Sequence, residues 1–507
     1  MERPGQPQVL AIGLDSAEPT LVRRLLDRGE LPTLAGLLEN GHWALVDSKA
    51  ELASGAVWPT FFTGTDPSKH QTNSGWVWSP EAMACTHPDE GDLMTPFWKP
   101  FVDRGGSVGV IDVPFAPMTG AARGFEISEL GPHEIVHGTV RSSPSRASEI
   151  VARSPRHPFY EGPYGPGAAE DRDGKQRLSS ACVAGAQVRG ALVSELIDET
   201  RPELAIVVFP EIHHTTHQLW HMIEPDDELY ADAVPPDQWD LKPDLIEVYR
   251  EVDRQIGRIV EAAGSDTLVM AFSLHGMEPG PGIPVIHEPL LEALGFSARR
   301  TWRGLSWRDR GIALFGSAKR HAPHGLRSLY HRRAGSRTKH RLAQPTVVPP
   351  HDWSRTRAFS LPTDQRGYIR VNLAGREAKG IVRERDYRAT CDEIEDAFRG
   401  ARSADGEPLV RSVLRPAEES GGPPERLPDL VVSWSDAAFA APVRVVAQSI
   451  EFEAHPLRRD MTGQHANRGF CILDERLAQG QVSELIAGKD LHRPLLSALD
   501  ASSAATA

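Results

Sequence analysis

The chain has 507 residues, of which 40% are hydrophobic and 25% charged, and this balance excludes disordered, collagenous and coiled-coil proteins. Its 56 basic and 69 acidic residues leave a net charge of -13, which argues against a nucleic-acid-binding protein. The four cysteines stand far apart without a Cys-x-x-Cys pair, so we expect reduced, buried thiols rather than a disulfide framework.

The first strand is predicted at residues 9–14, a continuous apolar run that ends at Asp15, which is typical of a buried parallel strand. This run is too short for the core of a signal peptide, and no stretch approaches the ~20 apolar residues of a membrane span. We therefore expect a cytoplasmic protein. Leucines then recur at helical spacing between residues 21 and 38, with a break at Pro32.

Strands and helices alternate further along the chain. The apolar patterns predict strands at residues 108–111, 204–209 and 267–272, and helices at residues 183–197 and 245–260. This alternation indicates an α/β fold with a mostly parallel central sheet, helices on both faces, and ligands at the carboxyl ends of the strands.

Two regions lack this periodicity. Residues 154–175 are rich in Pro, Gly and charge, and are predicted to form a long surface loop. Residues 299–341, within an insertion that we place at 291–350, hold thirteen Lys or Arg and one acid, Asp309. This basic segment is either a solvated insertion or a cap that concentrates an anionic substrate.

Potential metal ligands follow two of the predicted strands. The segment from Glu211 to His217 contains the histidines His213, His214 and His217 and comes directly after strand 204–209, and His275 follows strand 267–272. Neutral imidazole is the commonest protein ligand for zinc-like ions. Several histidines at strand ends, with Asp15 at another, predict a metal site at this edge of the sheet.

A second motif runs from Ser54 through Trp58 to His70. A serine is a weak nucleophile that needs a base or a metal to hold its alkoxide. Without such a partner, Ser54 would be a turn or helix-cap residue.

These motifs together resemble the alkaline phosphatase superfamily, and within it the type I phosphodiesterase/nucleotide pyrophosphatase group. Besides Asp15 and residues 54–70, the resemblance rests on residues 213–220, 273–277 and 462–465. Residues 367–377 are similar to a strand-and-turn segment that is frequent in the group. The resemblance implies one alkaline-phosphatase-like catalytic domain over residues 1–507, with the basic insertion inside it.

The resemblance also implies a site with Ser54 as nucleophile between two metal ions. The first ion would be bound by His213, His217 and His465, which then converge although ~250 residues separate them. Three histidines with an open position suit a catalytic zinc, although Mn or Fe also accept nitrogen and oxygen ligands.

The second ion would be bound by Asp15, Ser54 and His275. The family has aspartate where this chain has His213 and Leu274, and leucine cannot bind a metal. We therefore expect one tight ion and one loose or absent ion, with Glu211 and His214 as possible additional ligands.

The expected function is metal-dependent hydrolysis of a small anionic phosphate ester, by a phosphodiesterase or pyrophosphatase. The sulfatase pattern Cys/Ser-x-Pro-x-Arg is missing at Ser54. The alternatives are a phosphomonoesterase or other phosphoryl transferase of the superfamily, and a metal-stabilised binding protein that has lost catalysis. The oligomeric state is left open.

Overall fold

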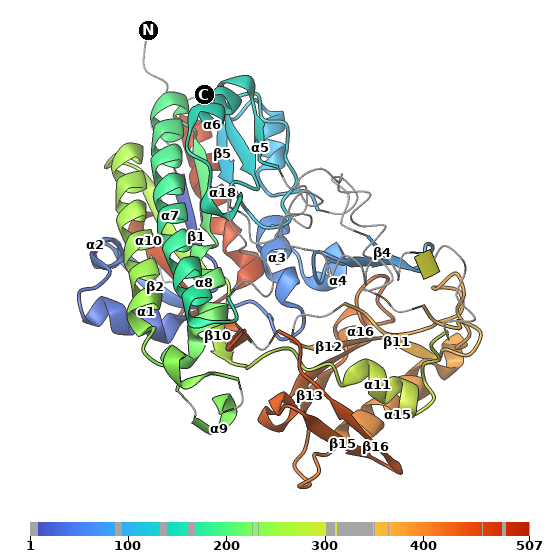
Figure 1. The fold of residues 1–507 in the computed structure, drawn as a ribbon. Coiled ribbons are helices and arrows are strands. Elements are labelled where there is room, and N and C mark those ends of the chain that lie inside the picture. Colours follow the sequence, from blue (N-terminus) through green and yellow to red (C-terminus); the bar gives the residue numbers. More distant parts are fainter. Residues whose placement is uncertain are drawn as a thin grey trace.

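A nine-stranded sheet forms the larger lobe of the computed structural model (Figure 1). The structure describes residues 9–86, 94–131, 139–160, 169–225, 227–231, 233–300, 310–311, 348, 350–362, 365–458, 460–478 and 483–505. The strand order is β19-β2-β18-β9-β1-β8-β5-β6-β7. The strands are β1 (Val9–Leu14), β2 (Gly41–Asp47), β5 (Val108–Ile111), β6 (Gly124–Ser128), β7 (Arg141–Ser143), β8 (Leu204–Phe209), β9 (Leu268–Ser273), β18 (Arg468–Asp474) and β19 (Leu485–Ala487).

The middle of this sheet is parallel. Neighbouring strands from β9 through β1, β8 and β5 to β6 all run in the same direction. Strand β18 is antiparallel to both of its neighbours, and β7 is antiparallel to β6. The prediction of an α/β fold with a mostly parallel central sheet is confirmed.

Helices cover both faces of the sheet, as alternate residues of β1 show. Leu10 and Ile12 belong to the hydrophobic cluster that includes the helices on one face, and Val9 and Ala11 belong to the cluster on the other face. The first face carries α1 (Pro19–Asp27), α2 (Pro32–Glu39), α6 (Ser145–Arg153), α7 (Arg172–Thr200), α8 (Glu211–Leu219) and α10 (Lys242–Ala263). The second face carries α3 (Val57–Thr63), α5 (Lys99–Asp103), α17 (Glu475–Ala478) and α18 (His492–Ala505).

A smaller lobe is built on an antiparallel sheet in the order β11-β12-β14-β13, with its own hydrophobic cluster (Figure 1). It consists of α11 (His287–Ala293), β11 (Ala358–Ser360), β12 (Gly367–Val371), α15 (Tyr387–Arg399), β13 (Val410–Leu414), α16 (Pro416–Ser420), β14 (Leu430–Trp434), β15 (Val443–Ala447) and β16 (Ile450–Ala454). The sequence predicts only the β12 segment of this lobe.

Short elements complete the described chain. Strands β10 (Gly276–Pro279) and β17 (Gly463–Ala466) form a two-stranded ribbon. In the chain, β10 follows the sheet strand β9, and β17 precedes the sheet strand β18. The remaining elements are α4 (Pro67–His70), β3 (Val77–Ser79), β4 (Ala84–Thr86), α9 (Asp227–Tyr230) and the 3-10 turns η1 (Ser54–Ala56), η2 (Pro158–Tyr160), η3 (Trp220–Met222), η4 (Pro236–Gln238), η6 (Glu384–Asp386), η7 (Asp436–Phe439) and η8 (Gly488–Asp490).

The predicted strands at 9–14, 108–111 and 204–209 have the boundaries of β1, β5 and β8. The strand predicted at 267–272 is β9, which begins one residue later. The predicted loop at 154–175 extends too far, because α7 already begins at Arg172. The Asp171 side chain accepts a hydrogen bond of 2.7 Å from the Gly174 N–H and so caps this helix. Residues 161–168 and most of the basic segment 299–341 lie outside the described residues.

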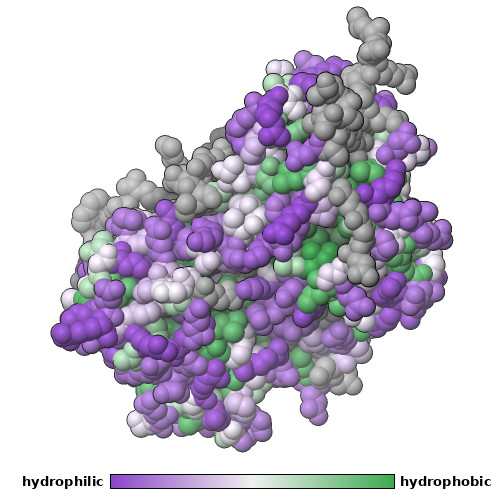
Figure 2. Space-filling model, turned by 180° about the vertical axis from the view of Figure 1, so that it is seen from behind, coloured by the Kyte–Doolittle hydropathy of each residue, from purple (hydrophilic) through white to green (hydrophobic). Residues whose placement is uncertain are grey.

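The mostly hydrophilic surface and the free, buried cysteines are those expected from the charged composition and the wide spacing of the cysteines. Seen from behind, the molecule is mostly hydrophilic, with small separate hydrophobic patches (Figure 2). All four cysteines are free and buried, and burial raises the pKa of each thiol. Among the described residues, none of the helices combines the length and the apolar composition that crossing a bilayer requires.

Candidate metal centre

The centre begins where three neighbouring parallel strands end. Strand β1 lies between β8 and β9, so Asp15 after β1 lies between the residues that follow the other two strands. Asp15 Oδ2 is 3.6 Å from Nδ1 of His213, and Asp15 Oδ1 is 3.6 Å from Nε2 of His275. All three side chains are buried. The strand order therefore brings together residues from three distant parts of the sequence.

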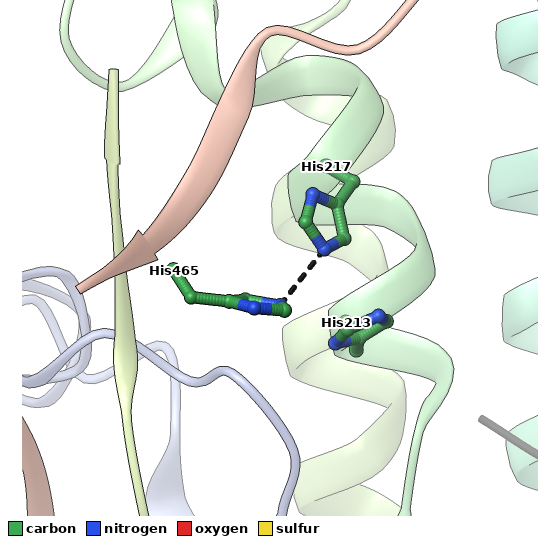
Figure 3. A group of neighbouring side chains, drawn as sticks. All are labelled: His213, His217 and His465. Carbon is green, nitrogen blue, oxygen red and sulfur yellow. Dashed lines mark hydrogen bonds between the residues drawn. The ribbon is translucent and has the colours of Figure 1, made fainter. Parts of the chain in front are cut away.

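Two more histidines complete the cluster (Figure 3). His213 and His217 are one turn apart on α8, so they share a face of that helix. His465 approaches from β17, and its Nε2 lies 2.9 Å from Nε2 of His217. Each of the three histidines offers a ligand nitrogen, and these nitrogens all lie within 4.8 Å of one another. The predicted convergence of these side chains is present in the structure.

Backbone carbonyl groups determine which nitrogen of two histidines is available as a ligand. A carbonyl oxygen can only accept, so Nδ1–H of His217 donates to the Gly463 carbonyl at 2.8 Å. In the same way Nδ1–H of His275 donates to the Gly276 carbonyl at 3.2 Å. The lone pair of each neutral ring is then on Nε2, the atom that faces the cluster.

Trp58 connects Asp15 to the Ser54 segment. Its indole Nε1–H donates to Asp15 Oδ1 at 3.0 Å. The ring packs against β1 at Gly13, where a Cβ atom would lie only 2.6 Å from Trp58 Cη2, so glycine is required there. Ser54 is half-buried and begins η1, which continues directly into the helix that carries Trp58. The Ser54 segment is thus attached to the strand that presents Asp15.

Asn73 is a candidate functional residue that the sequence alone does not predict. A Cβ on Gly55 would lie 2.7 Å from the Asn73 carbonyl oxygen, so the Asn73 backbone packs tightly against the residue that follows Ser54. The Asn73 side chain is 1% exposed, and within the described part of the chain neither end of its amide has a hydrogen-bond partner. A buried amide without partners is costly in a folded protein, which is typical of a functional group. No spacing in the sequence distinguishes this asparagine.

Ser16 is a second candidate residue that the sequence alone does not predict. Its Oγ lies 2.7 Å from Nδ1 of His213, and the residue is fully buried. Its backbone has a φ of 62°, in the left-handed region that non-glycine residues rarely adopt. Ser16 therefore sits in an unfavourable conformation while it contacts a candidate ligand, as strained residues at functional sites often do.

Glu211 and His214 are outside the group of three ligand nitrogens, although the His214 ring contacts the His213 ring edge-on, with ring centroids 5.5 Å apart. Both residues occupy a different face of α8 from His213. The ring of His214 packs edge-on against the ring of Phe159, with ring centroids 4.7 Å apart. Glu211 Oε1 accepts hydrogen bonds from Arg189 Nε at 3.0 Å and His157 Nε2 at 3.2 Å. Burial would raise the pKa of Glu211, but these two partners hold it below its ordinary value. Neither candidate belongs to the group of neighbouring ligand nitrogens.

Leu274 lies in the hydrophobic core. Its side chain is 1% exposed and belongs to the same apolar cluster as Trp58 and Phe272. The position where the family has an aspartate is therefore used here for packing.

Comparison with known proteins gives one family. The family model described as type I phosphodiesterase / nucleotide pyrophosphatase matches residues 9–441. No curated protein matches the chain. Among solved structures, phosphonoacetate hydrolase from Sinorhizobium meliloti 1021 is 15% identical, with 98% of this chain and 96% of that chain covered and a TM-score of 0.49. Murine ectonucleotide pyrophosphatase / phosphodiesterase 5 is 12% identical, with coverage of 98% and 95% and a TM-score of 0.43. The alkaline phosphatase PafA is 11% identical, with coverage of 99% and 97% and a TM-score of 0.49.

Substitution of Leu274 by aspartate tests whether this position can still serve a metal. We expect Leu274→Asp to lower the free energy of unfolding by about 3–5 kcal/mol, because it buries an unpaired charge. Urea denaturation with and without added zinc measures this loss, and Leu274→Met, which keeps the volume and the apolar character, is the control. A Leu274→Asp protein that gains a metal ion per chain and loses no stability would contradict the packing role.

Removal of the Ser16 hydroxyl tests its contact with His213. We expect Ser16→Gly to weaken zinc binding by about 10- to 100-fold, as loss of a hydrogen bond to a ligand typically does. Glycine relieves the positive φ at the same time, so a loss of affinity cannot be attributed to added backbone strain. Zinc affinity is measured by competition with a chromophoric chelator. Unchanged affinity in Ser16→Gly would mean that the hydroxyl does not orient His213.

Proposed function

Because the chain belongs to the type I phosphodiesterase/nucleotide pyrophosphatase family, we propose that it hydrolyses phosphodiesters with Ser54 as nucleophile at a histidine-rich metal centre. Membership of this family makes the chain a phosphoric ester hydrolase. The metal, the nucleophile and the preference for diesters are the proposal. The observation that carries it is the convergence of His213, His217 and His465 beside Asp15.

The donor set fits a divalent ion of the zinc class. Three imidazoles supply the ligands of a catalytic zinc site and leave a coordination position for another group. His217 supports this interpretation most directly, since its Nδ1 proton is committed to a carbonyl and its Nε2 faces His465. Asp15 and His275 lie beside the three histidines and offer a carboxylate and an imidazole to a second, more weakly bound ion. A bound ion would supply positive charge to the phosphoryl oxygens and to the attacking oxygen.

The chain's own residues would carry out the transfer in two steps. The oxygen of Ser54 forms a bond to phosphorus while the bond from phosphorus to the leaving alcohol breaks. The leaving alcohol takes up the proton that Ser54 loses, and the phosphoryl group on Ser54 keeps its second ester. Water then attacks this phosphorus, which releases a phosphate monoester and restores the Ser54 hydroxyl. The side-chain amide of Asn73, a residue whose backbone packs against Gly55, would donate a hydrogen bond to a non-bridging phosphoryl oxygen, where negative charge increases.

A metal-dependence assay tests the proposed activity. We expect protein stripped of metal by chelation to lose hydrolysis of bis-p-nitrophenyl phosphate and to recover it with zinc or another first-row ion, because the bound ion would supply positive charge to the phosphoryl oxygens. The diester should be hydrolysed with a higher kcat/KM than p-nitrophenyl phosphate. Full activity without metal would contradict the proposal, and a metal-binding protein without activity towards either ester would support a binding function instead.

Replacement of Ser54 tests the nucleophile. We expect Ser54→Ala to lower kcat by at least about a thousandfold while the melting temperature changes little, because the change removes the attacking oxygen and little else. Ser68→Ala in the same region of the chain is the matched control and should retain activity. If Ser54→Ala hydrolyses the diester at the normal rate, water attacks phosphorus without a serine intermediate.

A further inference from the structure

A glutamine of the smaller lobe lies against the strand that carries His465. Gln365 comes two residues before β12 and is buried. Its side-chain nitrogen donates to the carbonyl oxygens of Gly280 and Gly282, at 3.1 Å each, and to that of Gly463 at 3.3 Å. Gly463 belongs to β17, and the other two glycines follow β10. One amide group therefore holds β17 to the turn that follows β10.

The Gly463 carbonyl is shared between Gln365 and a candidate metal ligand. It also accepts the hydrogen bond from Nδ1–H of His217 at 2.8 Å. A carbonyl oxygen has two lone pairs, so it can accept both bonds at once. Because this carbonyl binds the proton on Nδ1, its position determines how the His217 ring is turned and where the Nε2 lone pair points. Gln365 thus bonds to the group that orients His217.

The next residue, Arg366, binds the same strand two residues further along. Its Nη2 donates to the His465 carbonyl at 3.1 Å, and its Nη1 donates to Ser433 Oγ of β14 at 2.8 Å. Carbonyls two residues apart along a strand point to the same edge of that strand. Two adjacent residues of the smaller lobe therefore bind two carbonyls on one edge of β17.

Both residues are attached to the sheet of the smaller lobe. Strand β12 starts at Gly367, which pairs with Val432 of β14. A Cβ atom on Gly367 would lie 2.9 Å from Trp434 Cζ2, so the start of the strand packs closely against the core of this lobe. Groups that are held by a packed sheet are placed more precisely than groups on a loop. The smaller lobe can therefore hold β17 in one position.

Strand β17 also packs against α8. A Cβ atom on Gly463 would lie 2.9 Å from the Thr216 carbonyl oxygen, so there is no room for a side chain at this contact. The Thr462 N–H donates to the His217 carbonyl at 2.7 Å. The position of β17 thus depends on both α8 and the smaller lobe. A shift of the strand would change the separation of His217 and His465, whose Nε2 atoms lie 2.9 Å apart.

We propose that Gln365 and Arg366 are positioning residues of the metal centre, through which the smaller lobe sets the orientation and separation of His217 and His465. This inference rests on the proposed function, because it assigns both residues to the histidines that bind the metal. Gln365 has the more direct effect, since a single carbonyl joins its amide to the His217 ring. Removal of a hydrogen bond to a metal ligand typically costs about 10- to 100-fold in affinity, and a residue one bond further away belongs at the lower end of that range.

The zinc affinity of a glutamine variant tests the proposal. We expect Gln365→Met, which keeps the length of the side chain but donates no hydrogen bond, to bind zinc about tenfold more weakly than the wild-type protein. Competition with a chromophoric chelator measures the affinity. Thr390→Val is the matched control, because it removes the hydrogen bond of a buried threonine to the Asp386 carbonyl within the same lobe, and it should leave the zinc affinity unchanged.

Cobalt provides a readout that a loss of stability alone would not change, because the visible absorption of cobalt(II) depends on the arrangement of its ligands. We expect the spectrum of cobalt-saturated Gln365→Met to differ from that of the wild-type protein, and the spectrum of Thr390→Val to be the same. If Gln365→Met does not fold, Gln365→Asn takes its place. Its amide is one methylene shorter and cannot reach the three carbonyls, so the same tenfold loss is expected.

The inference and the proposed function fail in different ways. Zinc affinity and a cobalt spectrum unchanged from the wild-type protein in the Gln365 variant, even with a lower melting temperature, would overturn the positioning role and leave the metal centre intact. Equal losses of affinity in the Gln365 variant and in Thr390→Val would overturn it as well. Failure of the wild-type protein to bind zinc or cobalt would contradict the proposed metal centre, and the inference with it.

Discussion

The candidate centre depends on a two-way exchange of hydrogen bonds between α8 and the segment that leads into β17. The His217 ring donates to the Gly463 carbonyl, and the His217 carbonyl accepts from the Thr462 N–H at 2.7 Å. One exchange thus fixes both the orientation of the His217 ring and the path of the chain towards His465. Lys175 adds to this contact, since its buried Nζ donates to the Gln218 and Asp460 carbonyls, at 2.8 Å each. Because α8 and β17 are distant in the sequence, the centre forms only when these two segments pack together.

Buried charge fixes the other end of α8. Arg189 is fully buried and donates to Glu211 in the first turn of α8, to Asp112 after β5 at 2.7 Å, and to the Gly131 carbonyl at 3.0 Å. Breaking such a buried pair on one side typically costs about 3–5 kcal/mol, because a charge remains without compensation. The network therefore holds the ends of three neighbouring strands in one arrangement. His213 follows Glu211 by two residues, so the same network also fixes the position of His213.

Much of the fold follows from local patterns. Strand β1 could be placed to the residue, because a short apolar run that ends in an aspartate has few other interpretations. The antiparallel sheet of the smaller lobe could not be predicted, since its strands pair over long separations and have no uniform alternation. Helix α7 begins earlier than expected because the cap at Asp171 is a single side-chain contact.

The candidate site also contains some residues that the sequence predicts and others that it does not. His213, His217 and His465 could be named because imidazoles near strand ends and a family pattern point to them. Glu211 and His214 are possible additional ligands by sequence, but the helix α8 places them on another face, where they contact Arg189 and Phe159. Ser16 and Asn73 depend on contacts between distant segments, which no spacing in the sequence encodes.

X-ray absorption spectroscopy of the zinc-loaded protein tests the assignment of the metal ligands, because it reports the atoms bound to the ion without reference to activity. We expect three imidazole nitrogens at about 2.0 to 2.1 Å from zinc. The imidazole signal should fall by one ring in His217→Ala and be unchanged in His214→Ala, whose ring packs against Phe159. A zinc shell of oxygen atoms alone, or a loss of one ring in His214→Ala but not in His217→Ala, would contradict the assignment of the metal centre.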